Sequence, residues 1–341
     1  MYPLVLLFVL VTVVRGEFDE AKAVRLFHLA AASYGDRVDE CLVQSLSPPS
    51  LHRSLSVLFE ECDIFDNSCA FFISHSKRSG ESVISFRGTK TPTQLFVEGW
   101  QSLTPSVDFF DMGLVNRYFI TAHLSMWKAI EEYLSLPEYK HHKVYFTGHS
   151  LGGALASLAA ARTVKQGYRP SSHVQLYTFG QPRPGSLKFA RSFDALVPES
   201  YRIVNGRDVV PHLPSCAKNE SATRNNVAPC STRMEDEAYH HGTEVWYPAG
   251  MVPGSRSFVV CRGEPRNEDF SCSDKLKYRL DDFGQAVNEH RTYYGIKVSK
   301  HGKSACVHDV YRGSRSGEEE GAIGRALTRV NSFFKAIGFT K

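Results

Sequence analysis

The stretch Lys143–Ala161, "KVYFTGHSLGGALASLAAA", decides the fold. Its first residues, Val144 to Thr147, are β-branched or aromatic and predict a short buried strand. Its second half is rich in alanine and leucine and predicts a helix, with no proline before Pro170. Between them, residues 148–152 fit G-x-S-x-G, the pattern of a sharp strand-to-helix turn that exposes Ser150. Glycines flank the serine because so sharp a turn leaves no room for Cβ atoms.

Strand and helix signals alternate on both sides of this stretch. "CAFFISHS" and "SVISFRGT" predict a hairpin, and "HVQLYTFG" and "SYRIVNGRD" predict further strands. Apolar residues recur at helical spacing in segments that begin at Phe18, at Leu114 and near Leu187. This alternation predicts an α/β fold with a largely parallel central sheet and helices on both faces. The region from Cys216 to Cys272 reads as rich in loops and cysteines.

The length of the chain and its N-terminal segment indicate how the domains are organised. The chain has 341 residues, 42% of them hydrophobic, which suits one large core. Its first residues, "MYPLVLLFVLVTVVRGEF", hold an apolar run too short to span a bilayer, followed by the small Gly16. We expect a signal peptide over residues 1–16, a domain over 17–306 and an extension over 307–341. A buried N-terminal helix is the alternative for the first segment.

Charge and cysteine usage narrow the function classes. A formal net charge of +4 is too mild to indicate nucleic-acid binding, and we see no glycine-rich phosphate loop. Eight cysteines behind a signal peptide predict disulfides, whereas zinc ligation is disfavoured because no C-x2-C pair occurs. "CAKNES" places a glycosylation sequon at Asn219. Secretion is therefore expected, with no integral membrane segment beyond the signal peptide.

A serine nucleophile needs partners, and the sequence offers candidates. A serine hydroxyl is a weak nucleophile that requires a base, which an acid must orient. In the fold that carries G-x-S-x-G turns, the order along the chain is serine, acid, histidine. Asp208 directly follows the predicted strand in "SYRIVNGRDVVPHLP", although it could simply pair with Arg207. Six histidines come after it, and His212 is so near that it belongs to the same loop: His212, His240, His241, His290, His301 and His308.

The motifs together resemble the class 3, fungal-type (Rhizomucor-like) triacylglycerol lipase family. The matching pieces occur in the family's order over most of residues 18–306: "SFRGTK", "FTGHSLGGALA", "YTFGQPRPG", "RDVVPHLP", "YHHGTEVWYP" and "EHRTYYGI". The resemblance implies an α/β-hydrolase fold that hydrolyses carboxylic esters of acylglycerols through an acyl-enzyme. It implies no metal and no organic cofactor, and its partners would be a lipid or ester substrate and the lipid–water interface.

The resemblance also implies a role for each site residue. Ser150 would be the nucleophile and Asp208 the orienting acid, with His290 of "EHRTYYGI" as general base and His241 as the next candidate. The oxyanion hole would consist of Thr89 and the backbone N–H of Leu151. One departure is Glu289, which precedes the histidine where fungal members usually have aspartate. The alternative reading of Ser150 is a simple turn residue.

Disulfide pairings follow in part from the resemblance. It suggests that Cys41–Cys306 ties the first helix to the end of the domain and that Cys261–Cys272 closes a short loop. Elimination and proximity then suggest Cys62–Cys69 and Cys216–Cys230. Connectivity among eight cysteines cannot be deduced from sequence alone, so other pairings stay open.

Two segments outside the motifs have amphipathic character. "TPTQLFVEGWQSL", residues 91–103, follows the oxyanion residue and predicts a lid whose apolar surface is Leu95, Phe96, Val97 and Trp100. The alternative is a surface helix whose apolar face stays in the core. "GAIGRALTRVNSFFKAIGFTK" in the extension has helical spacing and predicts either an interfacial helix or a helix packed on the enzyme.

Substrate choice stays open on sequence grounds. Phospholipase A1 and feruloyl-esterase activities occur on the same fold, so the fold cannot choose among esters. A secreted lipid-binding protein without catalysis is a competing class.

Overall fold

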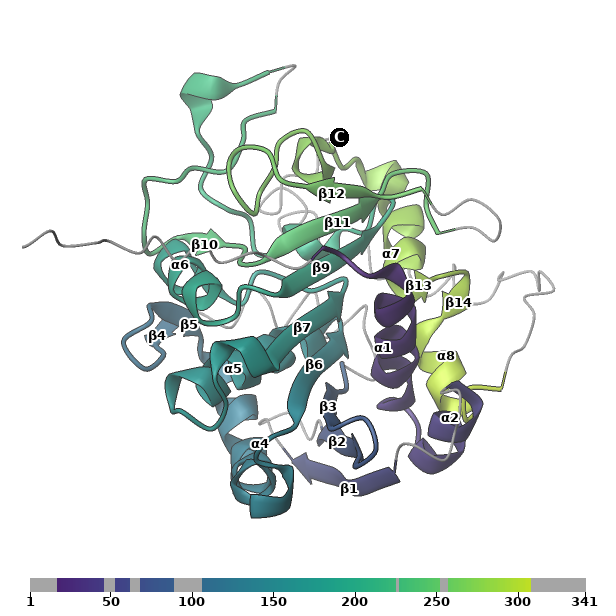
Figure 1. Ribbon diagram of the computed structural model, residues 1–341. Helices are drawn as coiled ribbons and strands as arrows, with labels where there is room; N and C mark the ends of the chain where they lie inside the picture. Colours follow the sequence, from purple (N-terminus) through teal and green to yellow (C-terminus); the bar gives the residue numbers. More distant parts are fainter. Residues whose placement is uncertain are drawn as a thin grey trace, which may run out of the picture.

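The computed structural model describes residues 17–45, 53–61, 68–88, 106–224, 227–251 and 257–307. The predicted signal peptide, almost all of the C-terminal extension, the predicted lid, Thr89 and Cys62 lie outside these residues. Near the two ends of the described part, the helices α1 (Glu20–Ala32) and α8 (Val298–Lys303) lie side by side (Figure 1).

The centre of the molecule is a mixed sheet whose inner strands are parallel. Within the described residues it has eight strands in the order β1-β2-β3-β6-β7-β9-β11-β12. The five strands from β3 to β11 in this order pair in parallel, and the flanking pairs are antiparallel. Their bounds are β1 Arg53–Glu61, β2 Ser68–Ser76, β3 Glu81–Phe86, β6 Lys143–His149, β7 Val174–Phe179, β9 Ser200–Asn205, β11 Thr243–Tyr247 and β12 Val259–Cys261. The α/β prediction and the predicted hairpin are confirmed.

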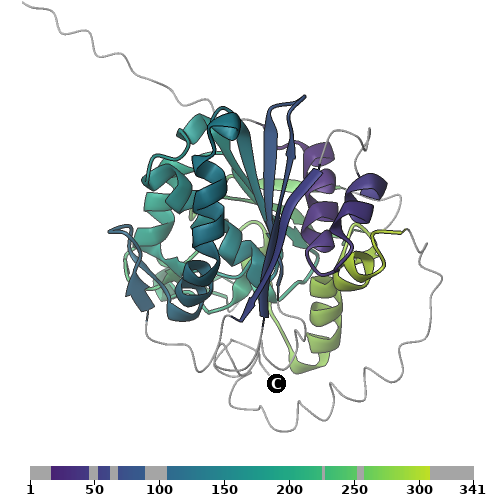
Figure 2. The same cartoon turned by 90° about the horizontal axis from the view of Figure 1, so that it is seen from below.

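Helices cover both faces of this sheet, as Figure 2 shows with the sheet nearly edge-on. The helices α4 (Arg117–Ser135), α5 (Leu151–Lys165) and α6 (Leu187–Leu196) connect successive parallel strands and share one face. They share it because right-handed crossovers that step in one direction place every helix on the same side. The other face is covered by helices from the first and last segments of the described part: α1 (Glu20–Ala32), α2 (Val38–Ser45), α7 (Phe283–Arg291) and α8 (Val298–Lys303).

Smaller elements surround the main sheet. A second sheet pairs in the order β10-β8-β5-β4, with bounds β10 Ala238–Tyr239, β8 Gly185–Ser186, β5 Leu114–Asn116 and β4 Ser106–Asp108. A short hairpin joins β13 (Thr292–Tyr293) to β14 (Ile296–Lys297) just after α7. The 3₁₀ turns are η2 Pro137–Tyr139, η3 Ser171–His173, η4 Val210–His212, η5 Glu220–Ala222, η6 Ser273–Lys275 and η7 Leu280–Asp282.

Helix α5, which follows the serine, is buried on nearly every side. Ala154, Ala156 and Ala159 have no exposed surface, and all three belong to the core between this helix and its neighbours. A helix that is apolar all round is one that neighbours enclose, and small side chains let them approach closely. The alanine-rich pattern after Ser150 therefore reflects a central position that fixes where the helix begins.

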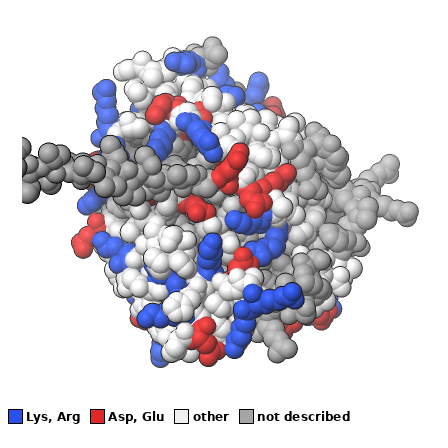
Figure 3. All heavy atoms as spheres, in the orientation of Figure 1, with Lys and Arg blue, Asp and Glu red and all other residues white. Residues whose placement is uncertain are grey.

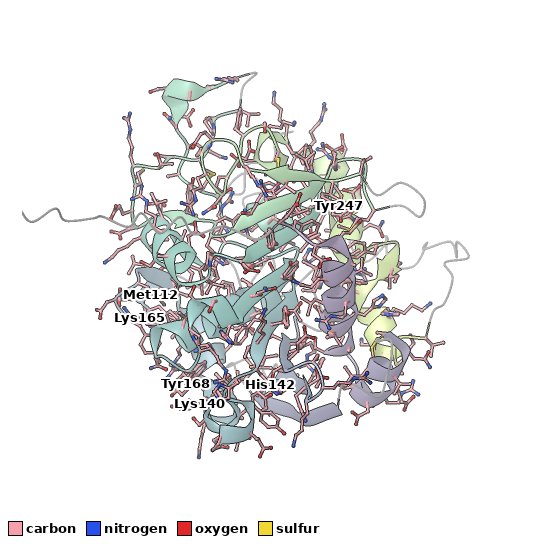
Figure 4. All side chains as sticks on the ribbon, viewed as in Figure 1. Met112, Lys140, His142, Lys165, Tyr168 and Tyr247 are labelled. Carbon is pink, nitrogen blue, oxygen red and sulfur yellow. A yellow bond between two sulfur atoms is a disulfide. The ribbon has the colours of Figure 1, made fainter. Side chains whose placement is uncertain are left out.

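Two elements differ from the sequence prediction. The helix predicted from Leu114 begins only at Arg117, because Asn116 caps it by accepting the N–H of Tyr118 at 2.9 Å, and residues 114–116 form β5 instead. The region predicted as loops contains β11, the last parallel strand of the main sheet, which is only five residues long. Tyr247 of this strand, labelled in Figure 4, donates to Glu20 at 3.1 Å and so ties the strand to α1.

Disulfides fasten the outer segments. Cys41–Cys306, Cys216–Cys230 and Cys261–Cys272 are bonded in the predicted pairs. Cys69 is also disulfide-bonded, but its predicted partner Cys62 lies outside the described residues.

The surface fits the mild charge of the chain. On the face seen in Figure 3, basic and acidic side chains are interspersed with uncharged surface. Among the described residues, no helix is both long and apolar enough to span a membrane.

Candidate active site

Ser150 occupies a strained turn between β6 and α5. Its φ of 59° lies in the left-handed region, where a non-glycine residue needs strong support from its surroundings. Its backbone N–H donates to Phe179 of the neighbouring strand at 2.9 Å. A Cβ at Gly148 would lie 2.3 Å from the backbone of Gly152, and one at Gly152 would lie 2.3 Å from the carbonyl oxygen of Phe86. Both glycines are therefore required by close backbone approach, as the motif predicts.

Asp208 follows β9 and is fully buried. Its Oδ1 accepts the backbone N–H of Val210 at 2.9 Å, and its Oδ2 accepts the hydroxyl of Tyr293 at 2.6 Å. The neighbouring Arg207 pairs with Asp282 at 3.2 Å, so the reading of Asp208 as a simple partner of Arg207 is wrong. The carboxylate is held by neutral donors.

His290 lies near the end of α7 and contacts both other residues. Its Nδ1 is 3.0 and 2.9 Å from the two carboxylate oxygens of Asp208, and its Nε2 is 2.9 Å from Ser150 Oγ. Because a carboxylate only accepts, Nδ1 carries the hydrogen, and Nε2 is left to accept the serine hydroxyl. The structure thus brings Ser150, His290 and Asp208 into one hydrogen-bonded row.

The other described histidines after Asp208 are engaged elsewhere. His241 is fully buried with its Nε2 3.0 Å from Gln181, and its ring lies 3.7 Å from that of Phe193. The Nε2 of His240 lies 2.6 Å from a backbone carbonyl, the ring of His212 packs against Tyr278, and the Nε2 of His301 lies 2.9 Å from His28. His308 lies outside the described residues. Of the described candidates, His290 is the one placed against Ser150.

The site is enclosed and keeps its tyrosines neutral. Ser150 is 4% exposed and His290 3%. Burial, and then the negative charge of Asp208, raise the pKa of Tyr293 and of Tyr278 well above the usual value. Both hydroxyls therefore stay protonated and donate, Tyr293 to the carboxylate and Tyr278 to the backbone carbonyl of Asp208 at 3.1 Å.

Sequence reasoning missed several residues that shape this row. Tyr293 lies inside "EHRTYYGI" but had no role assigned to it. Gly180 has a φ of 58°, and a Cβ there would lie 2.6 Å from Asp208 Oδ2 and 2.8 Å from His290 Nδ1. The signal that could have found it is a glycine directly after a predicted strand, where a ligand or a second chain segment often approaches closely.

Glu289 ties the acid and base segments together. Its carboxylate accepts the backbone N–H of Arg207, and its own carbonyl accepts from Asn205 Nδ2 at 3.1 Å. The turn that carries Asp208 is thereby attached to the helix that carries His290. Glu289, which stands where fungal members usually have aspartate, thus makes a direct contact between the two segments.

The predicted oxyanion and surface residues are described only in part. Leu151 is the first residue of α5, and Thr89 lies outside the described residues. Gly88 before it approaches the serine, since a Cβ there would lie 3.3 Å from Ser150 Cβ. Leu95, Phe96, Val97 and Trp100 also lie outside the described residues. Asn219 is half-buried before η5, in the loop that Cys216–Cys230 closes.

Two clusters have donor atoms close enough to hold a metal ion. They are Cys216, Cys230 and Asp274, and Glu244, Cys261 and Cys272. The cysteines of each cluster form a disulfide and so offer no thiolate ligand. These residues do not fit a metal site while the disulfides are intact.

Comparison with known proteins gives consistent relatives. A family model described as Lipase (class 3) matches residues 83–218. Lipase ZK262.3 of Caenorhabditis elegans is 44% identical over 295 residues, which are 85% of this chain and 83% of the relative. Phospholipase A1-II 1 of Oryza sativa subsp. indica is 33% identical over 127 residues, 37% of this chain and 31% of the relative. Among solved structures, the nonglycosylated LIP2 lipase of Yarrowia lipolytica has a TM-score of 0.63 at 18% identity, covering 82% of this chain and 96% of that one.

Proposed function

The chain belongs to the class 3 lipase family, and from this premise we propose that it is a secreted lipase that hydrolyses acylglycerol esters with Ser150, His290 and Asp208. Membership of the family makes it a carboxylic ester hydrolase of the triacylglycerol-lipase type. The observation that supports these residues is their geometry. His290 lies 2.9 Å from Ser150 Oγ on one side and 2.9 Å from Asp208 on the other.

The first half of the reaction forms an acyl-enzyme. His290 Nε2 takes the proton of Ser150 as the hydroxyl oxygen attacks the ester carbonyl. Asp208 stabilises the imidazolium that forms, and Tyr293 keeps the carboxylate in place. The backbone N–H of Leu151 and the predicted Thr89 donate to the developing oxyanion, where one donor is worth roughly 10²–10³ in rate. The leaving alcohol takes the proton back from His290 as its bond to the acyl carbon breaks.

The second half releases the fatty acid. Water gives a proton to His290 as its oxygen attacks the acyl carbon, and Ser150 recovers the proton when it leaves. The atoms balance as one ester plus one water giving one alcohol and one acid. The same residues serve both halves, so a substitution in the row should slow acylation and deacylation alike.

Substrate class is tested by direct comparison. Purified protein should hydrolyse triolein faster than phosphatidylcholine or a feruloyl ester, and Ser150→Ala should abolish whichever activity is found. Phospholipase A1 is the second candidate, because a rice phospholipase A1 is 33% identical over 127 residues. Faster release of the sn-1 fatty acid from phosphatidylcholine than of fatty acid from triolein would favour it.

Secretion is supported by the disulfides, which persist in oxidising compartments. Expression of the full chain in cultured eukaryotic cells should yield protein in the medium that begins at Glu17, as N-terminal sequencing would show. An endoglycosidase that lowers its mass would support glycan at Asn219. Protein retained in the cytosol with Met1 present would contradict the proposal.

A further inference from the structure

A second histidine, His149 of the serine turn, contacts both the ring and the main chain of His290. The rings of His149 and His290 stack with centroids 4.6 Å apart and planes 29° apart. His149 Nε2 is 2.8 Å from the main-chain oxygen of His290, and its Nδ1 is 2.9 Å from the hydroxyl of Tyr34. His149 is 3% exposed and Tyr34 6%, so neither contact competes with bulk water.

The partners fix the direction of these hydrogen bonds. A carbonyl oxygen only accepts, so His149 Nε2 carries the hydrogen and Nδ1 accepts from the hydroxyl of Tyr34. Burial, and then the neighbouring His290, lower the pKa of His149 to about 3, while burial raises the pKa of Tyr34. His149 therefore remains neutral at neutral pH.

The segment just after β3 packs closely against this pair. The backbone of Gly88 lies beside the hydroxyl of Tyr34. A Cβ at Gly88 would lie 2.2 Å from that hydroxyl oxygen, which shows how closely the backbone approaches it. Gly88 directly precedes Thr89, the predicted oxyanion residue. The row Gly88–Tyr34–His149–His290 thus links the segment on the oxyanion side to the base on the other side of the serine.

We propose that Tyr34 and His149 are positioning residues that hold the backbone of His290 in register with the serine turn and the end of β3. This inference rests on the proposed function, because it takes His290 as the base. Its physical basis is that a side-chain base follows its own main chain, and a displacement of about 1 Å can reduce the rate about 10²-fold. The catalytic groups stay Ser150, His290 and Asp208, and the pair acts through His290 alone.

Two substitutions of His149 separate positioning from packing. His149→Phe keeps a stacked ring and removes both hydrogen bonds, so we expect kcat to fall about 10- to 100-fold with KM unchanged. His149→Gln has an amide N–H that can donate to His290 and an amide oxygen that can accept from Tyr34. We expect it to recover kcat to within roughly fivefold of wild type.

A double-mutant cycle tests whether the pair acts as a unit. Tyr34→Phe removes only a hydroxyl and should lower kcat about 3- to 10-fold. Combined with His149→Phe, it should lower kcat scarcely further, because the chain is already broken. The matched control is Tyr145→Phe, which removes another buried tyrosine hydroxyl that donates to Glu81 at 3.1 Å, and its kcat should equal that of wild type.

Each outcome decides. A folded His149→Phe with wild-type kcat, or with the loss in KM alone, would overturn the inference, as would a His149→Gln variant that is equally impaired. If His149→Phe does not fold, the comparison of Tyr34→Phe with Tyr145→Phe gives the answer, and equal kcat values would sink the proposal. Ser150→Ala separates the two claims, since an active Ser150→Ala variant would refute the proposed function itself.

Discussion

Two buried polar clusters in this molecule differ in how their charges are held. The triad cluster consists of Ser150, Asp208, His290, Tyr293 and His149, and the charged cluster consists of Arg183, Arg202, Glu244, Glu268 and Asp274. All ten side chains are at most 5% exposed. Asp208 receives neutral donors and the imidazole of His290. Arg183 instead donates two hydrogen bonds to the carboxylate of Glu268, at 2.7 and 2.8 Å. Burial of polar groups therefore does not by itself mark a reactive site.

The charges of the second cluster are fixed by pairing. Burial alone would raise the pKa of Glu268, but the charges of Arg183 and Arg202, together with the hydrogen bonds that the carboxylate accepts from Arg183 and from the His240 backbone N–H, lower it. Asp274 lies farther from the Arg183 guanidinium, at 3.8 Å, and burial together with the charge of Glu268 raises its pKa. What distinguishes the triad cluster is a serine hydroxyl hydrogen-bonded to an imidazole whose other ring nitrogen faces a carboxylate. We expect changes in the first cluster to remove chemistry and changes in the second to remove stability.

The largest effect should come from the serine and the base. Ser150→Ala or His290→Ala should each lower kcat by about 10⁶, and the double variant should be scarcely worse, because the residues act as a unit. Circular dichroism and thermal melting should show a folded protein in each case. His241→Phe, beside the charged cluster, should retain kcat. An inactive but folded His241→Phe, paired with an active His290→Ala, would mean that the base has been misassigned.

A second prediction concerns the acid. Asp208→Asn should lower kcat by about 10⁴, because the amide can donate to His290 Nδ1 and so favours the tautomer with hydrogen on Nε2. That hydrogen would face Ser150 Oγ and prevent proton uptake. Steady-state kinetics on a soluble ester would measure the loss. A decrease of less than tenfold would argue against the tautomer explanation.

The charged cluster should respond in stability instead. Glu268→Ala leaves Arg183 buried and without its main partner, which should lower the free energy of unfolding by about 3–5 kcal/mol. The matched control is Glu235→Ala, whose partner Arg191 is 54% exposed, and this change should cost below about 1 kcal/mol. Urea unfolding would compare the two. Equal losses, or a folded Glu268→Ala without activity, would erase the distinction between the clusters.

The contrast also explains what the sequence could predict. Ser150 and Asp208 each directly follow a strand with a clear pattern, so local signals locate them. His290 was placed by resemblance, because five other histidines also follow Asp208. The contacts of Tyr34 with His149 and of Arg183 with Glu268 join residues 115 and 85 positions apart, and no local pattern encodes them. The strand β11 was missed because five residues inside a cysteine-rich region carry too weak a period.

The smallest predicted effect is a change in how the free energy of unfolding depends on acidic pH. Burial is the main cause that lowers the pKa of His123 and His149 to about 3 and those of His240 and His241 well below the usual value. When the pH falls below about 6.5, these histidines take up protons in the unfolded chain but stay neutral in the folded protein. Proton uptake therefore favours unfolding, and the stability that these groups contribute above pH 6.5 is lost as the pH falls below it. His241→Phe should reduce the slope of unfolding free energy between pH 5 and 6 by one proton, about 1.4 kcal/mol per pH unit. An unchanged slope would show that His241 is not neutral in the fold.

The most direct test of the central claim is covalent labelling of the full-length protein with a fluorophosphonate, followed by peptide mass spectrometry. The probe reacts with a serine only where a base and an oxyanion hole activate it. We predict one adduct per chain, on Ser150, that is absent in Ser150→Ala and forms much more slowly in His290→Ala. A folded protein with no adduct, or with its adduct on another serine, would contradict the account.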